Sequence, residues 1–275
     1  MEGLEAKLGS REVGSEDKLV PVCVVSLLSG PAYGTLIGRR LVENKQAFCN
    51  ACGYRCVLTG DRLSDRPPPW DKVMLVLAAM RHCNLTIWVD ADIVFRHPFR
   101  VASLVTPLHV AHDYYGINSG VFFAARSAAP LWAAAWNRSE YMHSDTWEQA
   151  ALKHVLRESA AARAQATIMP ELVAYPTFRT RNADAAPLYH PAGVCRAGTS
   201  PTRCQRLLNR TLDRVQKTAL LVDGSQACRR VYSYNRTTRQ VRSSDVRRTG
   251  NAKPARASSR PATAMRDPTS IPAPM

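Results

Sequence analysis

Apolar runs and helical patterns alternate along the first half of the chain. Residues 18–30 are almost continuously apolar and rich in β-branched side chains, as in a strand buried on both faces of a sheet. Apolar positions then recur at helical spacing over residues 35–52, and Gly53 follows as a stop signal. The pattern continues with a strand at 54–60, a helix at 70–83 and a strand at 85–89. This order predicts a β-α-β-α-β arrangement and therefore a parallel sheet.

The second half of the chain is patterned less regularly. Residues 107–127 predict two short strands around a turn, and residues 129–142 and 145–159 predict two helices. The pattern loosens between residues 168 and 198. In the first half, the proline run before Trp70 is expected to keep the helix from starting before its last proline. The fold class expected from these patterns is α/β, with a mixed second half.

The positive charge is concentrated at the carboxyl end of the chain. The formal net charge is +15, and the segment from Arg229 to Met275 holds 11 Lys/Arg against 2 Asp/Glu, a net +9. That segment has few large apolar residues and no periodicity, so we expect a disordered basic tail over 229–275. Residues 1–19 are expected to be flexible, and 20–228 to form one folded domain. Without a recognisable nucleic-acid-reading motif, a nucleic-acid partner is not expected.

Cysteine usage favours an oxidising compartment. The chain has 8 cysteines, of which Cys195 and Cys204 flank a loop and are expected to form a disulfide. Cys49, Cys52 and Cys56 form a single cluster, whereas zinc sites usually pair two clusters, so zinc is disfavoured. The amino terminus carries no signal peptide, and the longest apolar stretch is too short to span a bilayer. Either the protein is soluble and cytosolic, or its anchor lies outside this chain.

Two carboxylates follow the strand expected at residues 85–89. Asp90 and Asp92 leave the same face of an extended segment, where a divalent metal would relieve their repulsion. Ligands bind beyond the carboxyl ends of strands in open parallel sheets, so this position suits a metal site. The alternative is a strand end whose acids are merely solvated. His190 is the best third ligand, although a lone loop histidine is more often a surface residue, and two oxygens with one imidazole favour Mn²⁺.

Two further segments carry polar residues that suit a binding site. Asn118, Ser119 and Gly120 precede a buried strand, where they form a turn or let a ligand approach the backbone closely. Glu148 and Gln149 begin a predicted helix, in a pattern that equally fits a helix cap.

The order of these segments resembles the metal-dependent glycosyltransferases of the GT-A fold. Within them it is most similar to the galactosyl/xylosyltransferase family, which includes fungal galactomannan galactosyltransferases and plant xyloglucan xylosyltransferases. The resemblance covers about residues 20–196. It rests on five segments in sequence, namely NKQAFCNACGY, WDKVMLVLAAMRHCNLTIWVDADIVFRHP, INSGVFFAARSAAPLWAAAW, WEQAAL and YHPAGVC.

The resemblance implies a GT-A (Rossmann-like) nucleotide-sugar-binding fold with a mixed, mainly parallel central sheet. It implies a retaining transferase that moves a hexose or pentose from a nucleotide sugar, with UDP expected, to a glycan acceptor in the Golgi lumen. A membrane association would run through an anchor not present in this chain, and a cytoplasmic location stays open.

The resemblance also assigns roles to matching residues. Mn²⁺, with Mg²⁺ as the alternative, is expected on three ligands, and Asp90 also lies near the ribose. The remaining substrate-binding and catalytic positions follow the family motifs. The metal ligands are Asp90, Asp92 and His190; the substrate-binding residues are Asp90, Asn118, Ser119, Gly120 and Arg196; the catalytic residues are Gln149 and Glu148. Two alternative hypotheses are that the protein is another GT-A transferase, of the arabinosyltransferase or glycogenin type, or a non-catalytic GT-A-fold binding protein.

Overall fold

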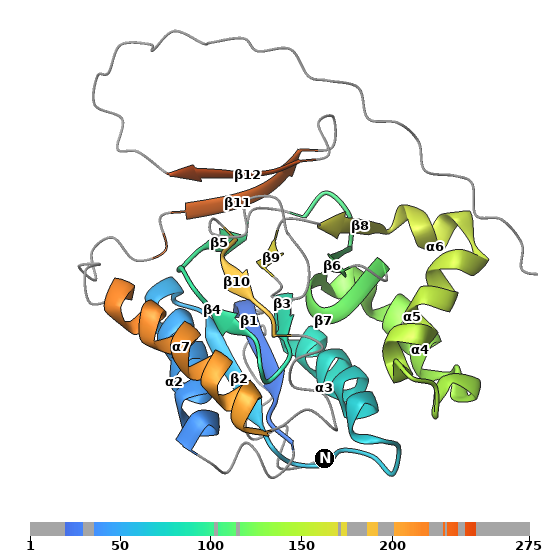
Figure 1. The fold of residues 1–275 in the computed structure, drawn as a ribbon. Coiled ribbons are helices and arrows are strands. Elements are labelled where there is room, and N and C mark those ends of the chain that lie inside the picture. Colours follow the sequence, from blue (N-terminus) through green and yellow to red (C-terminus); the bar gives the residue numbers. More distant parts are fainter. Residues whose placement is uncertain are drawn as a thin grey trace, which may run out of the picture.

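A six-stranded sheet forms the centre of the molecule (Figure 1). The computed structural model describes residues 20–29, 36–101, 104–113, 116–169, 172–174, 186–191, 201–219, 228, 230–235 and 240–245. The strand order is β2-β1-β3-β7-β6-β8. Only β7 runs against its neighbours β3 and β6, and the other pairs are parallel, so the sheet is mixed and mainly parallel. The strands are β1 (Val20–Leu27), β2 (Arg55–Thr59), β3 (Cys83–Val89), β6 (Leu108–Asp113), β7 (Gly116–Ala125) and β8 (Ala166–Met169).

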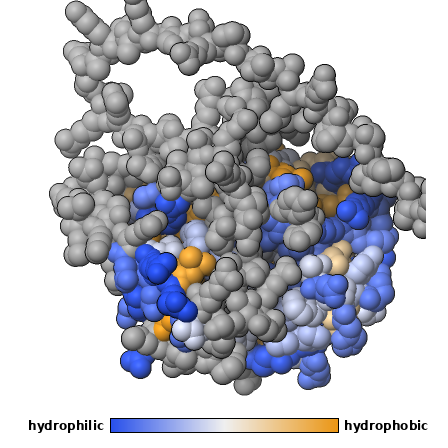
Figure 2. Space-filling model, in the orientation of Figure 1, coloured by the Kyte–Doolittle hydropathy of each residue, from blue (hydrophilic) through white to orange (hydrophobic). Residues whose placement is uncertain are grey.

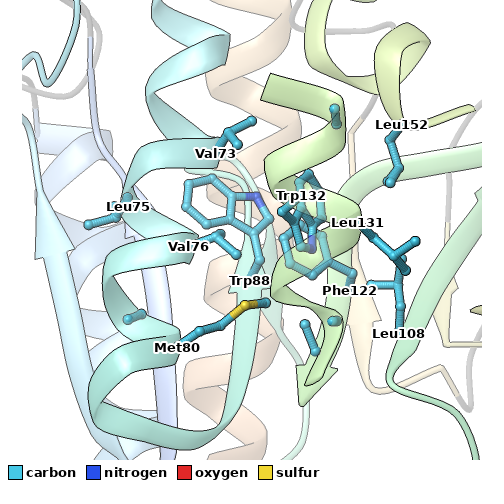
Figure 3. Close-up of a cluster of buried hydrophobic side chains, with 14 of the residues drawn as sticks. Val73, Leu75, Val76, Met80, Trp88, Leu108, Phe122, Leu131, Trp132 and Leu152 are labelled. Atoms are coloured by element: carbon cyan, nitrogen blue, oxygen red, sulfur yellow. The ribbon is translucent and has the colours of Figure 1, made fainter. Parts of the chain in front are cut away.

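Helices cover both faces of this sheet (Figure 1). On one face, α3, α4 and α5 surround a core that includes Trp88 and Phe122 (Figure 3). On the other face, α2 packs on Ile87 and Phe123, the sequence neighbours of those two residues. Successive strand residues point to opposite faces, which is why the continuous apolar strands serve two cores. The helices are α2 (Leu36–Cys52), α3 (Pro68–His82), α4 (Ala129–Trp136), α5 (Trp147–Glu158), α6 (Ala160–Ala164) and α7 (Pro201–Ala219), with 3₁₀ turns at Arg126–Ala128 and Ser139–Tyr141.

The α/β fold class expected from the pattern is confirmed, and two helix boundaries need correction. Helix α3 begins at Pro68 rather than at the last proline of its run, because backbone N–H groups in a first turn have no intrahelical acceptor to lose. Helix α4 ends at Trp136 and is followed by a 3₁₀ turn at Ser139–Tyr141, so the helix expected over 129–142 is split.

Several smaller elements were not expected from the sequence. Helix α7 packs Leu208 and Leu212 against Ile37 and Leu41 of α2. One small sheet joins β4 (Val94–Phe95), β10 (Leu188–Tyr189) and β9 (Val173–Ala174); another joins β12 (Gln240–Asp245), β11 (Arg230–Asn235) and β5 (Arg100–Val101).

The strands β11 and β12 lie in the segment where disorder is expected from the sequence. Over these residues the chain forms an antiparallel pair, and β11 also pairs with β5. Short segments of mixed polar and β-forming residues have a low mean hydropathy, so a composition typical of disorder does not exclude strands.

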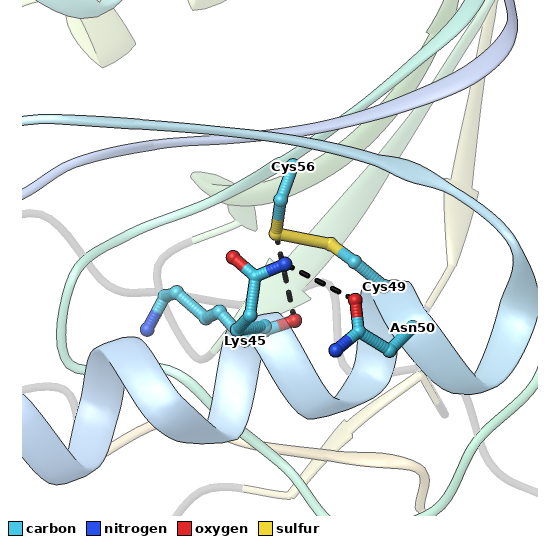
Figure 4. The surroundings of a disulfide bond; sticks show 5 residues. Lys45, Cys49, Asn50 and Cys56 are labelled. Atoms are coloured by element: carbon cyan, nitrogen blue, oxygen red, sulfur yellow. Dashed lines mark hydrogen bonds between the residues drawn. A yellow bond between two sulfur atoms is a disulfide. The ribbon is translucent and has the colours of Figure 1, made fainter.

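Three disulfides join described cysteines. The pairs are Cys23–Cys83, Cys49–Cys56 and Cys52–Cys228. Figure 4 shows the pair Cys49–Cys56, which joins α2 to β2. The cysteines of the 49–56 cluster are therefore bonded to sulfur, which excludes them as zinc ligands. Cys195 lies outside the described residues, so its expected disulfide with Cys204 stays a prediction.

Most of the described surface visible in Figure 2 is hydrophilic. In the described part of the chain, no helix has the length and apolar character needed to cross a membrane.

Candidate functional site

The two carboxylates lie in a turn at the carboxyl end of β3. The Asp90 N–H donates to Gly120 O at 2.8 Å, and the Ile93 N–H donates to Asp90 O at 3.1 Å. Because β7 is antiparallel to β3, with Val121 opposite Val89, the early residues of β7 meet the end of β3. This topology brings residues 118–120 to the carboxylates from about thirty positions away.

The two oxygens of Asp90 have different surroundings. Oδ1 accepts from Trp88 Nε1 at 2.8 Å and lies 3.0 Å from the Lys72 ammonium. Burial would raise the pKa of Asp90, but the charges of Lys72 and His190 lower it below its ordinary value. Oδ2 faces Gly120 instead, because a Cβ placed on that glycine would lie 3.0 Å from it. One oxygen is thus held by the protein, and the other faces the site.

Gly120 lies where several site residues converge. A Cβ there would lie only 2.7 Å from His190 Cε1 and 2.8 Å from Asn118 Oδ1. Any side chain at this position would displace His190 or Asp90. The glycine is required for this close approach rather than for its backbone angles.

His190 and Asp92 complete the cluster. His190 Nε2 lies 3.5 Å from Asp92 Oδ1, and the imidazole is buried. The Asp92 side chain keeps about a fifth of its surface exposed (21%). Burial raises the pKa of Asp92 above its ordinary value, although the charge of His190 acts in the opposite direction. A positive ligand between Asp90 and Asp92 would favour the charged form of both.

The donor set fits a divalent transition metal in its chemistry. Asp90, Asp92 and His190 would offer two carboxylates and one imidazole, and Gly120 leaves open the space beside Asp90 and His190. Among the described residues, however, no three His, Cys, Asp or Glu side chains are arranged as a preformed metal-binding group. The residues are gathered, but their present side-chain geometry is not that of a coordination shell.

A buried ion-pair network lies directly behind the carboxylates. The Lys72 ammonium lies 2.7 Å from Glu148 Oε1 and donates to Ser119 O at 3.2 Å. Ser119 Oγ also donates to Glu148 Oε1 at 2.8 Å. Burial would lower the pKa of Lys72, but Asp90 and Glu148 raise it above its ordinary value. Lys72 therefore stays a cation that links α3, α5 and the ends of two strands.

Lys72 was not among the residues expected from the sequence. The available signal is a lysine within the helix at 70–83, which is apolar on most sides and must be buried. A charged residue on such a helix needs a buried counter-charge, and the nearest acids in the sequence could have been considered for that role.

The residues expected from β7 and α5 are engaged with one another. Gln149 Oε1 accepts from Ser119 N at 2.8 Å, so its role toward a ligand falls to its amide nitrogen, which can only donate. The Asn118 amide donates to Asp113 at 2.7 Å and accepts from Gly120 N at 2.8 Å, which ties the first half of β7 to the end of β6; residues 118–120 therefore lie in a strand and not in a turn. Thr146, the N-cap residue of α5, makes no side-chain capping bond, and Gln149 binds Ser119 instead, so the helix-cap alternative for Gln149 is wrong.

Lys45 is a second functional candidate that the sequence did not indicate. It is fully buried on α2, and its ammonium donates to Ala91 O at 2.7 Å and to Ile93 O at 2.9 Å. These two carbonyls flank Asp92. Burial lowers the pKa of Lys45 to about 7, although Asp92 and Asp90 act in the opposite direction. Lys45 therefore fixes the loop that carries the carboxylates.

Arg196, the residue expected to contact a diphosphate, lies outside the described residues.

A groove of about 400 Å³ lies at the end of the sheet opposite to Asp90 and contains none of the site residues. Its lining includes Pro21, Leu85, Val105, Thr106 and Ala125.

Comparison by sequence finds no match: no protein-family model and no curated protein matches this chain. Solved structures do match it. A glycosyltransferase involved in the glycosylation of the major capsid of PBCV-1 aligns with a TM-score of 0.57 and 14% identity, over 69% of this chain and 99% of that chain. The glycosyltransferase GlyE of Streptococcus pneumoniae TIGR4 aligns with a TM-score of 0.46 and 10% identity, over 76% of this chain and 62% of that chain.

A mutant Drosophila β1,4-galactosyltransferase 7, in complex with manganese, UDP-Gal and xylobiose, aligns with a TM-score of 0.39 and 11% identity, over 68% of this chain and 80% of that chain. The fold assignment rests on the PBCV-1 enzyme, which is covered almost completely. The chain has an α/β, GT-A-like fold, as the sequence analysis expected.

Proposed function

We propose that the protein is a metal-dependent, retaining glycosyltransferase of the galactosyl/xylosyltransferase type. It transfers a hexose or pentose from a nucleotide sugar, with UDP as the expected nucleotide, to a glycan acceptor. The observation that carries this proposal is the approach of Asp90 and His190 to Gly120, with Asp92 3.5 Å from His190, at the carboxyl end of β3 in a GT-A-like sheet. The five family-like segments of the sequence support it.

Asp90, Asp92 and His190 would hold Mn²⁺, with Mg²⁺ as the alternative. A bound metal would supply positive charge against the diphosphate that leaves when the glycosidic bond breaks. Lys45 holds the carbonyls on both sides of Asp92, and Gly120 leaves the space open. Arg196 is proposed as a second cation at the diphosphate.

The buried pair Lys72 and Glu148 positions the sugar end of the site. Glu148 is only 2% exposed and is bound by Lys72 and Ser119, so it is poorly placed as a nucleophile. We assign to Gln149 the orientation of the donor sugar through its amide nitrogen. Retention then follows from front-face displacement: the acceptor hydroxyl attacks the anomeric carbon on the face that the diphosphate leaves, and its proton passes to the departing diphosphate.

The proposed location is the Golgi lumen. Three disulfides among the described residues require an oxidising compartment to form and persist, and the lumen provides one. The proposed partners are a nucleotide sugar and a glycan.

Calorimetric titration of UDP with and without Mn²⁺ tests the proposal. We expect UDP to bind only with the metal, and Asp92→Asn to abolish this binding, because it removes one ligand charge while keeping the side-chain shape. Asp65→Asn, at an exposed aspartate between β2 and α3, is the matched control and should bind as wild type does. A screen of UDP-sugars for Mn²⁺-dependent hydrolysis then identifies the donor. Equal UDP binding with and without metal would sink the proposal.

A further inference from the structure

Trp147 is an exposed aromatic residue and the first residue of α5. Among the described residues, the exposed large hydrophobic side chains are Val105 (47%), Ile168 (42%) and Trp147 (41%), and Trp147 is the aromatic one. It immediately precedes Glu148 and Gln149, both of which bind Ser119. An exposed indole beside such a site differs from a scattered surface aliphatic residue, because its position puts it within reach of a bound ligand.

The backbone of Trp147 has an unfavourable conformation. Its φ angle is +41°, in the left-handed region that glycine and asparagine favour and that a bulky side chain adopts only at a cost. The Trp147 N–H donates to Ser144 O at 3.2 Å and closes the turn that leads into α5. A glycine would form this turn without strain. Residues held in such conformations cluster at ligand-binding sites, where the side chain is needed in one place.

We propose that the Trp147 indole is a stacking platform for a sugar ring of the acceptor glycan. The C–H groups on one face of a pyranose ring form an apolar, slightly positive surface, and the face of an indole is apolar and slightly negative. The inference rests on the proposed function, since it places the acceptor beside the donor-sugar residues Glu148 and Gln149.

The position of Trp147 favours contact with the acceptor glycan over contact with the donor sugar. The groups assigned to the donor side are buried: Ser119 is 2% exposed and Glu148 is 2% exposed. Trp147 instead faces solvent, from which a polymeric acceptor must approach. The Cα atoms of Trp147 and Gln149 are at most about 7 Å apart, which is roughly the length of one sugar unit. We infer that a glycan whose end reaches Gln149 has its terminal or next sugar close enough to stack on the indole.

Intrinsic fluorescence and acceptor kinetics test the platform directly. In the presence of Mn²⁺ and UDP, we expect cellohexaose or mannohexaose to change the fluorescence of wild type and not that of Trp147→Phe. In transfer assays with the accepted saccharide, Trp147→Ala should raise the acceptor KM about tenfold, with a much smaller change in kcat. Trp147→Phe, which keeps a flat ring, should stay within about threefold of wild type.

Matched variants separate an effect on acceptor binding from an effect on the stability of the fold. Trp147→Gly removes the ring and relieves the backbone strain, so its Tm should equal or exceed that of wild type while its acceptor KM matches that of Trp147→Ala. Ile168→Ala, which truncates an equally exposed side chain, should leave the acceptor KM unchanged. UDP affinity should stay within about twofold of wild type in all variants, since a stacked acceptor contributes nothing to it.

The outcomes also distinguish this inference from the proposed function. If wild type binds no UDP with Mn²⁺, the proposed function fails, and this inference fails with it. If wild type binds UDP but neither saccharide changes its fluorescence, or if Trp147→Ala has the acceptor KM of wild type, the platform alone is refuted.

Discussion

Two buried lysines lie beside the 90–92 turn, one on α3 and one on α2, and their pKa values shift in opposite directions. Lys72 lies 2.7 Å from Glu148 and 3.0 Å from Asp90, and its pKa rises above the ordinary value although burial alone would lower it. Among the described residues, the Lys45 ammonium donates to the carbonyls of Ala91 and Ile93, and burial lowers its pKa to about 7. Direct contact with two carboxylates outweighs burial at Lys72, whereas the carbonyl contacts of Lys45 and the charges of Asp92 and Asp90 do not outweigh it.

Removal of Lys72 from its ion pairs with Glu148 and Asp90 is expected to cause the largest loss of stability. Lys72→Met leaves Glu148 and Asp90 facing an apolar side chain, and Glu148 is almost fully buried. We expect the free energy of unfolding to fall by about 3–5 kcal/mol, which is typical when one partner of a buried ion pair is removed. Urea unfolding at pH 7 measures this loss.

The matched double variant Lys72→Met/Glu148→Gln isolates the charge. It removes the uncompensated carboxylate, so part of the lost stability should return. If the double variant is as unstable as Lys72→Met, the loss reflects packing, and the contrast between the two lysines is not electrostatic.

The pH dependence of stability tests the lowered pKa of Lys45. Its pKa is about 7 in the folded protein against the ordinary 10.5, so between these pH values the unfolded chain binds more protons at this group. The free energy of unfolding should therefore rise with pH from about 7 to about 10.5, by at most about 1.4 kcal/mol per pH unit.

Comparing EDTA-treated wild type with Lys45→Met isolates this contribution. The stability of wild type relative to Lys45→Met should increase with pH across the window. Lys72 has a raised pKa, so its stabilisation is fully present below 10.5 and is lost only as the pH rises through its higher folded value. A Lys72→Met curve should therefore run parallel to that of wild type. Parallel curves for Lys45→Met as well would contradict the lowered pKa.

The contrast also separates what the sequence could predict from what it could not. The strand that ends at Val89 and the acids beyond it form one local pattern, so the position of Asp90 at a sheet edge was predictable. The partners of Lys72 and Lys45 lie 18 to 76 positions away, and only the folded chain brings them together. Burial and charge pairing are tertiary properties, which periodicity does not encode.

Elements that were not expected from the sequence also depend on distant partners. Helix α7 is strongly polar, and it packs on α2 through Leu208 and Leu212, while Arg40 of α2 binds its polar residues Asn209 and Asp213. The Cys52–Cys228 disulfide spans 176 positions, and a count of cysteines cannot choose among pairings over such distances. Gly120 is the opposite case. Its place in a small, polar segment before a buried strand already indicated a close approach.

The close approach at Gly120 can be tested by adding a single methyl group. Gly120→Ala places a Cβ 2.7 Å from His190 Cε1 and 3.0 Å from Asp90 Oδ2, so one of these side chains must move. Overpacking of this kind costs about 1–3 kcal/mol of stability, less than the loss expected for Lys72→Met. Because the displaced groups are the proposed metal ligands, Mn²⁺-dependent UDP binding should fall much more than stability does. Gly60→Ala is the matched control, since its Cβ would meet Leu28 O at an ordinary 3.4 Å. Unchanged UDP affinity in a folded Gly120→Ala protein would show that His190 and Asp90 need not converge for binding.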